Sequence, residues 1–121
     1  MTWKRCFLSD SKMAYDEGVA QRLREEFADR IDVAEKKMFG GIAFMLSGNM
    51  CCGVIGETLM ARVGAEQYEK ALSQSHVREM DFTGKPLTGF VYVEPEGFES
   101  DTELQRWVSA CENFVDSLPP K

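Results

Sequence analysis

The stretch between Met38 and Gly64 constrains the fold most, because its short apolar runs are separated by turn-forming residues. The runs GGIAFML and MCCGVI are joined by Ser47-Gly48-Asn49, and Gly56-Glu57-Thr58 leads into a third run, LMARV. Gly and Asn between short apolar runs are typical of β-hairpins. The stretch therefore predicts an antiparallel meander. Three further glycines are candidates for a bulge or a close backbone contact: Gly40, Gly41 and Gly53.

Helical patterns lie on both sides of this meander. In residues 15–31 the apolar positions recur every four residues and predict one helical face: Val19, Leu23, Phe27 and Ile31. Residues 65–72 predict a short helix. Ser100 and Glu103 form an S-x-x-E capping box before a long apolar-periodic segment, in which we expect Trp107 to be buried beside Leu104, Cys111 and Phe114.

The order of these elements predicts an α+β fold. FVYV reads as one more strand, and the segment SHVREMDFTGKPLTG before it reads as a loop. We expect an antiparallel β-meander of about four to five strands, packed with an N-terminal helix, a short middle helix and a long C-terminal helix.

Length and charge narrow the class of protein. The chain has 121 residues, which suggests a single domain over residues 14–121, with 1–13 as an extension of uncertain origin before or at Met13. The net charge of −6 argues against a nucleic-acid binder, which usually carries a basic patch. No apolar run approaches the ~20 residues of a membrane span, and the N-terminus lacks the apolar region of a signal peptide. We therefore expect a cytoplasmic protein.

No catalytic or cofactor motif stands out. The pattern G-x-x-x-x-G-K-[ST] is absent, and Gly40-Gly41 leads into a strand, so no nucleotide site is expected. Neighbouring strand residues point to opposite faces, so Cys51 and Cys52 should not share a ligand, and Cys111 falls on an apolar helix face. The single histidine, His76, has no identifiable partner for nucleophilic chemistry. We expect reduced structural cysteines and no cofactor, metal or catalytic residue.

Arg62 is a candidate binding residue, because it places a charge within the apolar run LMARV. One interpretation is an ion pair with Glu57 or Glu66 at a sheet end. The other is an anion site that Arg62 forms with Lys85 and the backbone near Thr83. The sequence alone does not bring the two segments together.

Three segments carry a resemblance to a known family: KKMFGGIAFMLSGNMCCGVIGETLMARVG, VREMDFTGKPLTGFVYV and LQRWVSACENFVDSLPPK. From about Ala14 to Lys121 the chain resembles the TfoX (Sxy) N-terminal domain family. The most telling positions of the resemblance are the following: Met38-Phe39-Gly40-Gly41, Arg62-Val63, Met80-Asp81-Phe82-Thr83-Gly84, Trp107 and Leu118-Pro119-Pro120-Lys121. The resemblance implies an α+β domain with an antiparallel sheet. In larger members this domain precedes a C-terminal domain, and the protein promotes expression of DNA-uptake (competence) genes.

Two classes of function follow. The first is a non-enzymatic regulatory or protein-interaction domain that does not itself bind DNA tightly. The alternative is a small-ligand-binding protein or enzyme with a site around Arg62, His76 and Thr83, which a deep pocket joining those residues would favour.

Both alternating sets of residues in IAFML and MCCGVI are apolar, so both sheet faces should be covered. Either the three helices cover both faces, or a second copy in a homodimer or another protein partner covers the face that bears Ala43, Met45, Cys51 and Ile55.

Overall fold

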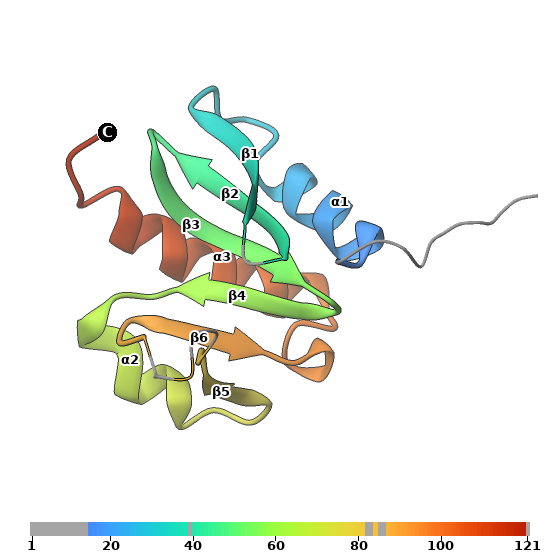
Figure 1. The fold of residues 1–121 in the computed structure, drawn as a ribbon, viewed down its shortest axis with the longest axis vertical. Helices are drawn as coiled ribbons and strands as arrows, with labels where there is room; N and C mark the ends of the chain where they lie inside the picture. The colour runs from blue at the N-terminus through green and yellow to red at the C-terminus, as the bar shows by residue number, and fades with distance from the viewer. Residues whose placement is uncertain (1–14, 39, 82–83, 85–86, 121) are drawn as a thin grey trace, which may run out of the picture.

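The computed structural model describes residues 15–38, 40–81, 84 and 87–120. Its centre is a six-stranded antiparallel sheet in the order β1-β2-β3-β4-β6-β5 (Figure 1). The elements in chain order are α1 (Glu17–Glu26), β1 (Val33–Met38), β2 (Gly41–Leu46), β3 (Asn49–Ile55), β4 (Thr58–Arg62), α2 (Ala65–Leu72), β5 (Val77–Glu79), β6 (Phe90–Val93), the short 3-10 helix η2 (Pro95–Gly97) and α3 (Asp101–Val115). The predicted α+β class is confirmed, although the sheet has six strands rather than four to five.

The predicted hairpin chemistry is confirmed at the β2–β3 turn. Leu46 pairs with Asn49, and both residues between them have positive φ, 50° at Ser47 and 86° at Gly48. Two such residues in succession match the twist of the flanking strands. The side chain of Asn49 is buried and donates to the carbonyl oxygen of Pro119 at 2.9 Å, which fastens the end of the chain to this hairpin.

A β-bulge changes where the paired cysteines point. Phe44 pairs with Cys52 but Met45 pairs with Met50, so Cys51 is an extra residue on β3. Because a bulge breaks the alternation of side chains, Cys51 and Cys52 both lie in the core cluster on the helical side. The prediction that these two neighbours point to opposite faces is therefore wrong.

The first helix is shorter than its apolar spacing predicts. Asp16 caps α1 by accepting from the backbone N–H of Val19 at 3.1 Å, and Phe27 follows its last turn. The chain then turns away, so Ile31 is fully exposed and not part of the helical face. The four-residue spacing continues through the turn by coincidence.

The sequence pattern does not identify the two edge strands, β1 and β5. In β1 the middle residues, Ala34 to Lys37, are all exposed, and three of them are charged. Charged side chains are a common protection of sheet edges, but they hide the alternation that identifies a strand. The other edge strand, β5, has three residues and lies within the segment predicted to be a loop.

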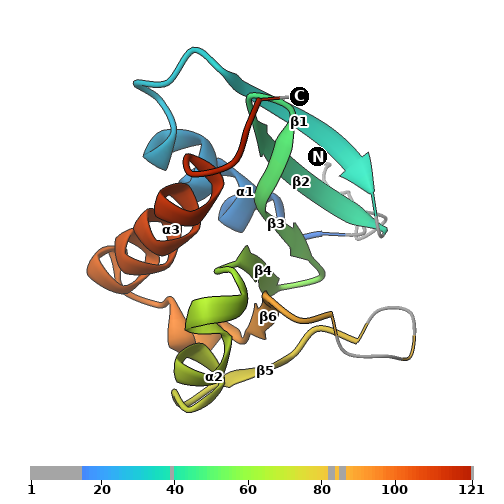
Figure 2. The same ribbon diagram turned by 90° about the vertical axis from the view of Figure 1, so that its left-hand side faces the viewer.

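The helices α1, α2 and α3 all lie on one side of the sheet (Figure 2). The opposite face holds a second cluster, drawn from strands and the segment between β5 and β6. Its buried members are Ala43, Met50, Met60, Met80 and Tyr92, with Met38, Met45, Ile55, Leu87 and Phe90 partly buried. The interpretation that the helices wrap both faces is therefore wrong. Self-association through this second face stays a prediction.

The long C-terminal helix packs as its sequence predicts. The capping box of Ser100 and Glu103 is present at its N-terminus. Trp107 is 6% exposed and lies in the main core with Leu104 and Cys111, while Phe114 packs against that core from its edge. The indole N–H of Trp107 donates to the carbonyl oxygen of Gly97 at 3.1 Å, so α3 is tied to η2 as well as to the sheet. Among the described residues, no helix is long and apolar enough to cross a membrane.

Arg30 joins the segment after α1 to the end of α3. Its guanidinium donates to Asp32 at 2.9 Å, to Glu112 at 3.1 Å and to Asp116 at 2.9 Å. The hydrogen bonds from Arg30, and a further one from the Ser47 hydroxyl, hold the pKa of the Asp32 carboxyl well below its usual range. The network therefore depends on an ionised Asp32.

We expect this network to make the free energy of unfolding fall as the pH is lowered into the acid range. Because the pKa of Asp32 is lower in the folded than in the unfolded chain, its stabilisation is complete above the unfolded value of about 4 and is lost as the pH falls toward the folded value. Asp32→Asn should lower the urea midpoint at pH 7 and flatten its fall below about pH 4. Asp29→Asn, at an exposed position that pairs with no cation of the described residues, is the control. Identical acid dependence in the two variants would contradict the role of Asp32.

Candidate functional site

A groove lies between α2 and α3. Its volume is about 1000 Å³. It forms because α3 packs on β3 and β4 whereas α2 packs on β5 and β6, so the two helices lie next to each other over neighbouring strands of the sheet. Val63, Ala71, Trp107, Ala110 and Phe114 provide its apolar lining.

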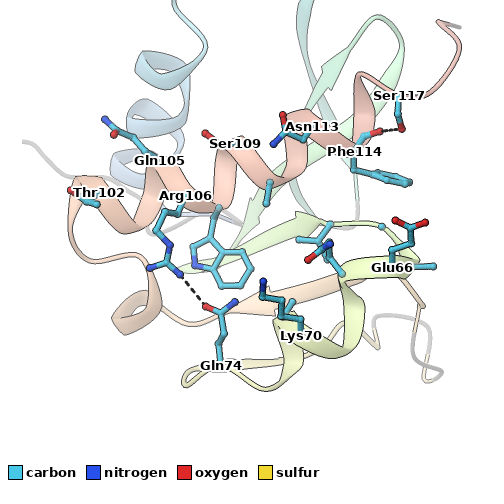
Figure 3. Close-up of a pocket in the computed structure, with 17 residues that line it drawn as sticks. Glu66, Lys70, Gln74, Thr102, Gln105, Arg106, Ser109, Asn113, Phe114 and Ser117 are labelled. Carbon is cyan, nitrogen blue, oxygen red and sulfur yellow. Dashed lines mark hydrogen bonds between the residues drawn. The ribbon is translucent and has the colours of Figure 1, made fainter.

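The remaining lining of the groove is polar but mostly uncharged. Its uncharged polar residues carry amide side chains, Gln67, Gln74, Gln105 and Asn113, or hydroxyl side chains, Thr102, Ser109 and Ser117 (Figure 3). It contains no histidine or cysteine and one carboxylate, Glu66. A hydroxyl nucleophile needs an adjacent general base, and Ser109 has none of the usual bases beside it in this lining. The chemistry of the groove suits binding.

Two cations enter the groove from opposite walls. Arg106 reaches from α3 toward α2, and Lys70 rises from α2 into the same space (Figure 3). The guanidinium of Arg106 donates to the amide oxygen of Gln74 at 3.4 Å, which is longer than the usual range of about 2.7–3.2 Å. No ion pair joins either cation to an acidic side chain of the described residues.

The close approach of α3 to the start of α2 depends on Gly64. This residue has φ +88°, and a Cβ there would overlap the ring of Phe114. The backbone N–H groups of Val63 and Gly64 both donate to the carbonyl oxygen of Gly89, at 2.8 and 3.1 Å. Backbone hydrogen bonds therefore fix the position of Gly64 at this end of the groove.

Arg62, predicted as an anion ligand, lies beside this end of the groove but is occupied by internal contacts. It donates to the backbone carbonyl of Met50 at 3.2 Å, and its guanidinium carbon lies 5.3 Å from the ring centres of both Phe90 and Phe114. No ion pair joins it to Glu57 or Glu66, both of which are described. Thr83 and Lys85, its predicted partners, lie outside the described residues.

His76 does not join Arg62 in one site. Arg62 pairs with Phe90, whereas the carbonyl of His76 accepts from the N–H of Glu94, four residues further along. At about 3.3 Å per residue, these levels are roughly 13 Å apart. His76 itself is exposed with φ +67°. The alternative site around Arg62, His76 and Thr83 is therefore not assembled from the two residues that the structure describes.

The three described cysteines form one buried cluster. Cys51 and Cys111 are 0% exposed and Cys52 is 1% exposed, and all three are free thiols. Interaction with the thiols of Cys111 and Cys52 lowers the pKa of Cys51, whereas interaction with Cys51 and burial raise the pKa of Cys52 and Cys111. Reactive cysteines need partial exposure, so none of the three can attack a substrate. No group of His, Cys, Asp or Glu within the described ranges is arranged to hold a metal ion.

We expect these thiols to be inert in the native protein. In a Cys6→Ser variant, which removes the cysteine outside the described residues, an aromatic disulfide reagent should label the three remaining thiols only after unfolding in urea. The melting temperature should not change with dithiothreitol. Rapid labelling of one thiol under native conditions, or a large drop in melting temperature with reductant, would contradict this expectation.

The glycines of the family motif lie where the backbone has positive φ or where another strand approaches closely. Gly40 has φ +77° in the β1–β2 turn, and a Cβ at Gly41 would overlap the carbonyl oxygen of Val54. Met38 pairs with Gly41 and packs on the second cluster. Gly84 has φ +87° and donates to the carbonyl of Asp81 at 2.8 Å. Phe39 and Phe82 lie outside the described residues.

Sequence reasoning missed the groove because its lining comes from two helices that are far apart in the chain. One signal is present in the sequence. Along α3 and the turn that follows it, uncharged polar residues that line the groove recur at helical spacing (Thr102, Gln105, Ser109, Asn113 and Ser117) in a chain with 20 Asp and Glu residues. A solvated helix face in such an acidic chain usually carries charges.

Comparison with known proteins agrees with the motif positions. The family model of the TfoX N-terminal domain matches residues 25–115, most of the 121-residue chain. No curated protein and no solved structure shows significant similarity to the chain. The matched range runs from the last two residues of α1 to the end of α3 and includes the whole sheet. The chain therefore belongs to the TfoX N-terminal domain family.

Proposed function

We propose that this chain is a non-enzymatic regulatory domain that acts by binding a protein partner in the groove between α2 and α3. The observation that carries the proposal is the groove itself, which is about 1000 Å³ in volume and lined by amides, hydroxyls and small apolar groups. It is at the upper end of the ~300–1,000 Å³ range of small-molecule pockets, and it lies between two helices, an arrangement that suits a segment of protein.

Membership in a family of regulatory domains supports the same proposal. The family resemblance connects this domain with expression of DNA-uptake genes, and we propose a regulatory role for this chain through a partner. The lack of a base beside Ser109 in the groove and the burial of Cys51, Cys52 and Cys111 weigh against an enzyme.

Blocking the groove tests the proposal in the native host. A strain that lacks the gene is complemented with the wild-type chain, with Ser109→Trp, or with Glu25→Trp, which places the same bulk on the exposed side of α1. We expect the wild-type chain and Glu25→Trp to restore the transcript profile and Ser109→Trp to fail, with equal urea midpoints for the two variants. Full restoration by Ser109→Trp would contradict the proposal.

We further expect no direct, tight binding of duplex DNA by this chain. Its net charge of −6 repels phosphates, and four arginines of the described residues, Arg22, Arg24, Arg30 and Arg78, are already paired with carboxylates. Gel retardation at physiological ionic strength should show no complex. Submicromolar, salt-dependent retention of a DNA fragment would contradict this expectation.

A further inference from the structure

We propose that the segment bound in the α2–α3 groove is an acidic α-helix of the partner, with a carboxylate placed between Lys70 and Arg106. This inference rests on the proposed function and adds the chemistry of the partner.

The first argument compares the contacts of Arg106 with those of the other described arginines. Arg24 donates to Glu35 at 2.7 Å, and Arg30 contacts three carboxylates. Arg78 donates to Glu94 at 2.7 Å. Of the six arginines in the described part of the chain, four are paired with carboxylates, and Arg62 is held by a backbone carbonyl and two aromatic rings. Arg106 instead has one long contact to an amide, and Lys70 faces it across the groove.

The second argument is that a carboxylate can accept from the N–H donors of Arg106 that the contact with Gln74 does not use. A guanidinium carries five N–H donors, and a carboxylate accepts two of them in parallel. The contact with Gln74 uses one donor group at 3.4 Å. A carboxylate that entered between Arg106 and Lys70 would receive charge-assisted hydrogen bonds from both walls of the groove.

The third argument concerns direction. Glu66 lies at the opposite end of the groove from Arg106, on the side of Phe114 (Figure 3). It repels an acidic group there, so the groove is positive at one end and negative at the other. Complementary charge fixes register and orientation more than it adds affinity. The acidic residue of the partner should therefore lie at the Arg106 end.

The fourth argument favours a helix as the bound shape. The groove lies between two helices, and several of its lining residues are small: Gly64, Ala65, Ala71, Ser109 and Ala110. Small residues allow a third helix to approach closely, and an amphipathic helix in such a groove is a common mode of recognition. The amides of Gln67, Gln105 and Asn113 can each donate to and accept from its polar side.

The experiment uses a display library that tiles the encoded proteins of the native host in segments of about 16 residues, roughly four helical turns. Selection on the full chain is followed by a counter-screen against Ser109→Trp. We expect the segments that bind only the open groove to be rich in Asp and Glu and to be periodic in their apolar residues. Selection of neutral or basic segments that are blocked by Ser109→Trp would overturn the acidic helix and leave the proposed function standing.

The strongest segment is then synthesised and its affinity measured by fluorescence anisotropy. The double variant Lys70→Glu/Arg106→Glu should weaken binding by about tenfold or more, and changing the critical acidic residue of the peptide to lysine should recover part of the loss. Lys36→Glu/Lys37→Glu, which reverses two exposed cations on β1, is the matched control and should leave affinity unchanged. Equal weakening by both double variants would overturn the proposal.

A proline at the centre of the peptide tests the helix. Proline interrupts a helix because it lacks a backbone N–H and its ring clashes with the preceding turn, so binding should be lost. Unchanged affinity for the proline peptide would overturn the helical shape. A library that yields no segment sensitive to Ser109→Trp would instead overturn the proposed use of the groove.

Discussion

Trp107→Ala is expected to leave a poorly folded protein. Trp107 is 6% exposed, and it packs in the main core while its indole N–H bonds to the carbonyl of Gly97. Truncation of a buried aromatic side chain to alanine costs ~3–5 kcal/mol, against a typical total stability of ~5–15 kcal/mol. A urea titration followed by circular dichroism measures the loss.

Two further variants show where the loss at Trp107 originates. Trp107→Phe keeps much of the apolar burial but loses the hydrogen bond to Gly97, so it should cost less, about 1–2 kcal/mol. Gln105→Ala, on the exposed side of the same helix, should be close to neutral. A near-wild-type midpoint for Trp107→Ala would show that α3 does not anchor the core through this residue.

Gly41→Ala is the second change with a large expected effect. A Cβ at Gly41 would overlap the backbone carbonyl oxygen of Val54 and lie 3.0 Å from the Cα of Ile55. Backbone cannot rotate away as a side chain can, so β2 and β3 would have to separate. We expect a loss at or above the upper end of the ~1–3 kcal/mol range for overpacking, measured as a shift in the urea midpoint.

Gly40→Ala is the matched control for Gly41→Ala. Gly40 has φ +77°, and a Cβ added there would meet no described atom within 4 Å. The substitution therefore carries only the cost of the left-handed conformation, about 1–2 kcal/mol, and the two neighbouring glycines should differ clearly. If Gly41→Ala is no worse than Gly40→Ala, the close strand contact is not a constraint on this fold.

The parts of the fold that the sequence predicts are those with strong local signals. The turn at Ser47-Gly48 has two positive φ values, and Gly48 adopts its value without the steric cost of a Cβ. The capping box of Ser100 and Glu103 sets the start of α3, and the apolar spacing after it places Trp107 in the core. Each of these features is determined within a few residues of the chain.

The missed features depend on contacts between distant segments. β1 is a strand because it pairs with β2, although its middle residues are exposed and charged. The bulge at Cys51 comes from the shift in pairing between β2 and β3, and it overrides the alternation that would separate Cys51 from Cys52. Ile31 continues a helical spacing in sequence, yet the Arg30 contacts with Glu112 and Asp116 belong to a turn that leads away from the helix.

The candidate site was likewise missed because it depends on contacts between segments that are distant in the chain. Arg62 is a reasonable candidate from sequence, since a lone charge in an apolar run calls for a partner, but its partners are a backbone carbonyl and two rings. The groove depends on how α2 and α3 lie on the sheet, which no local pattern specifies. The uncharged polar residues at helical spacing along α3 are the one clue in the sequence, and they indicate a groove only once α2 is known to lie beside α3.

Site-specific photocrosslinking in the native host tests most directly whether a protein occupies the groove. A photoreactive phenylalanine derivative replaces Ser109 inside the groove or, as the control, Glu25 on the exposed side of α1. We predict a discrete protein adduct from position 109 that is absent from position 25 and is lost when Lys70→Glu and Arg106→Glu are present in the same chain. No adduct from position 109, or the same adducts from both positions, would contradict the account.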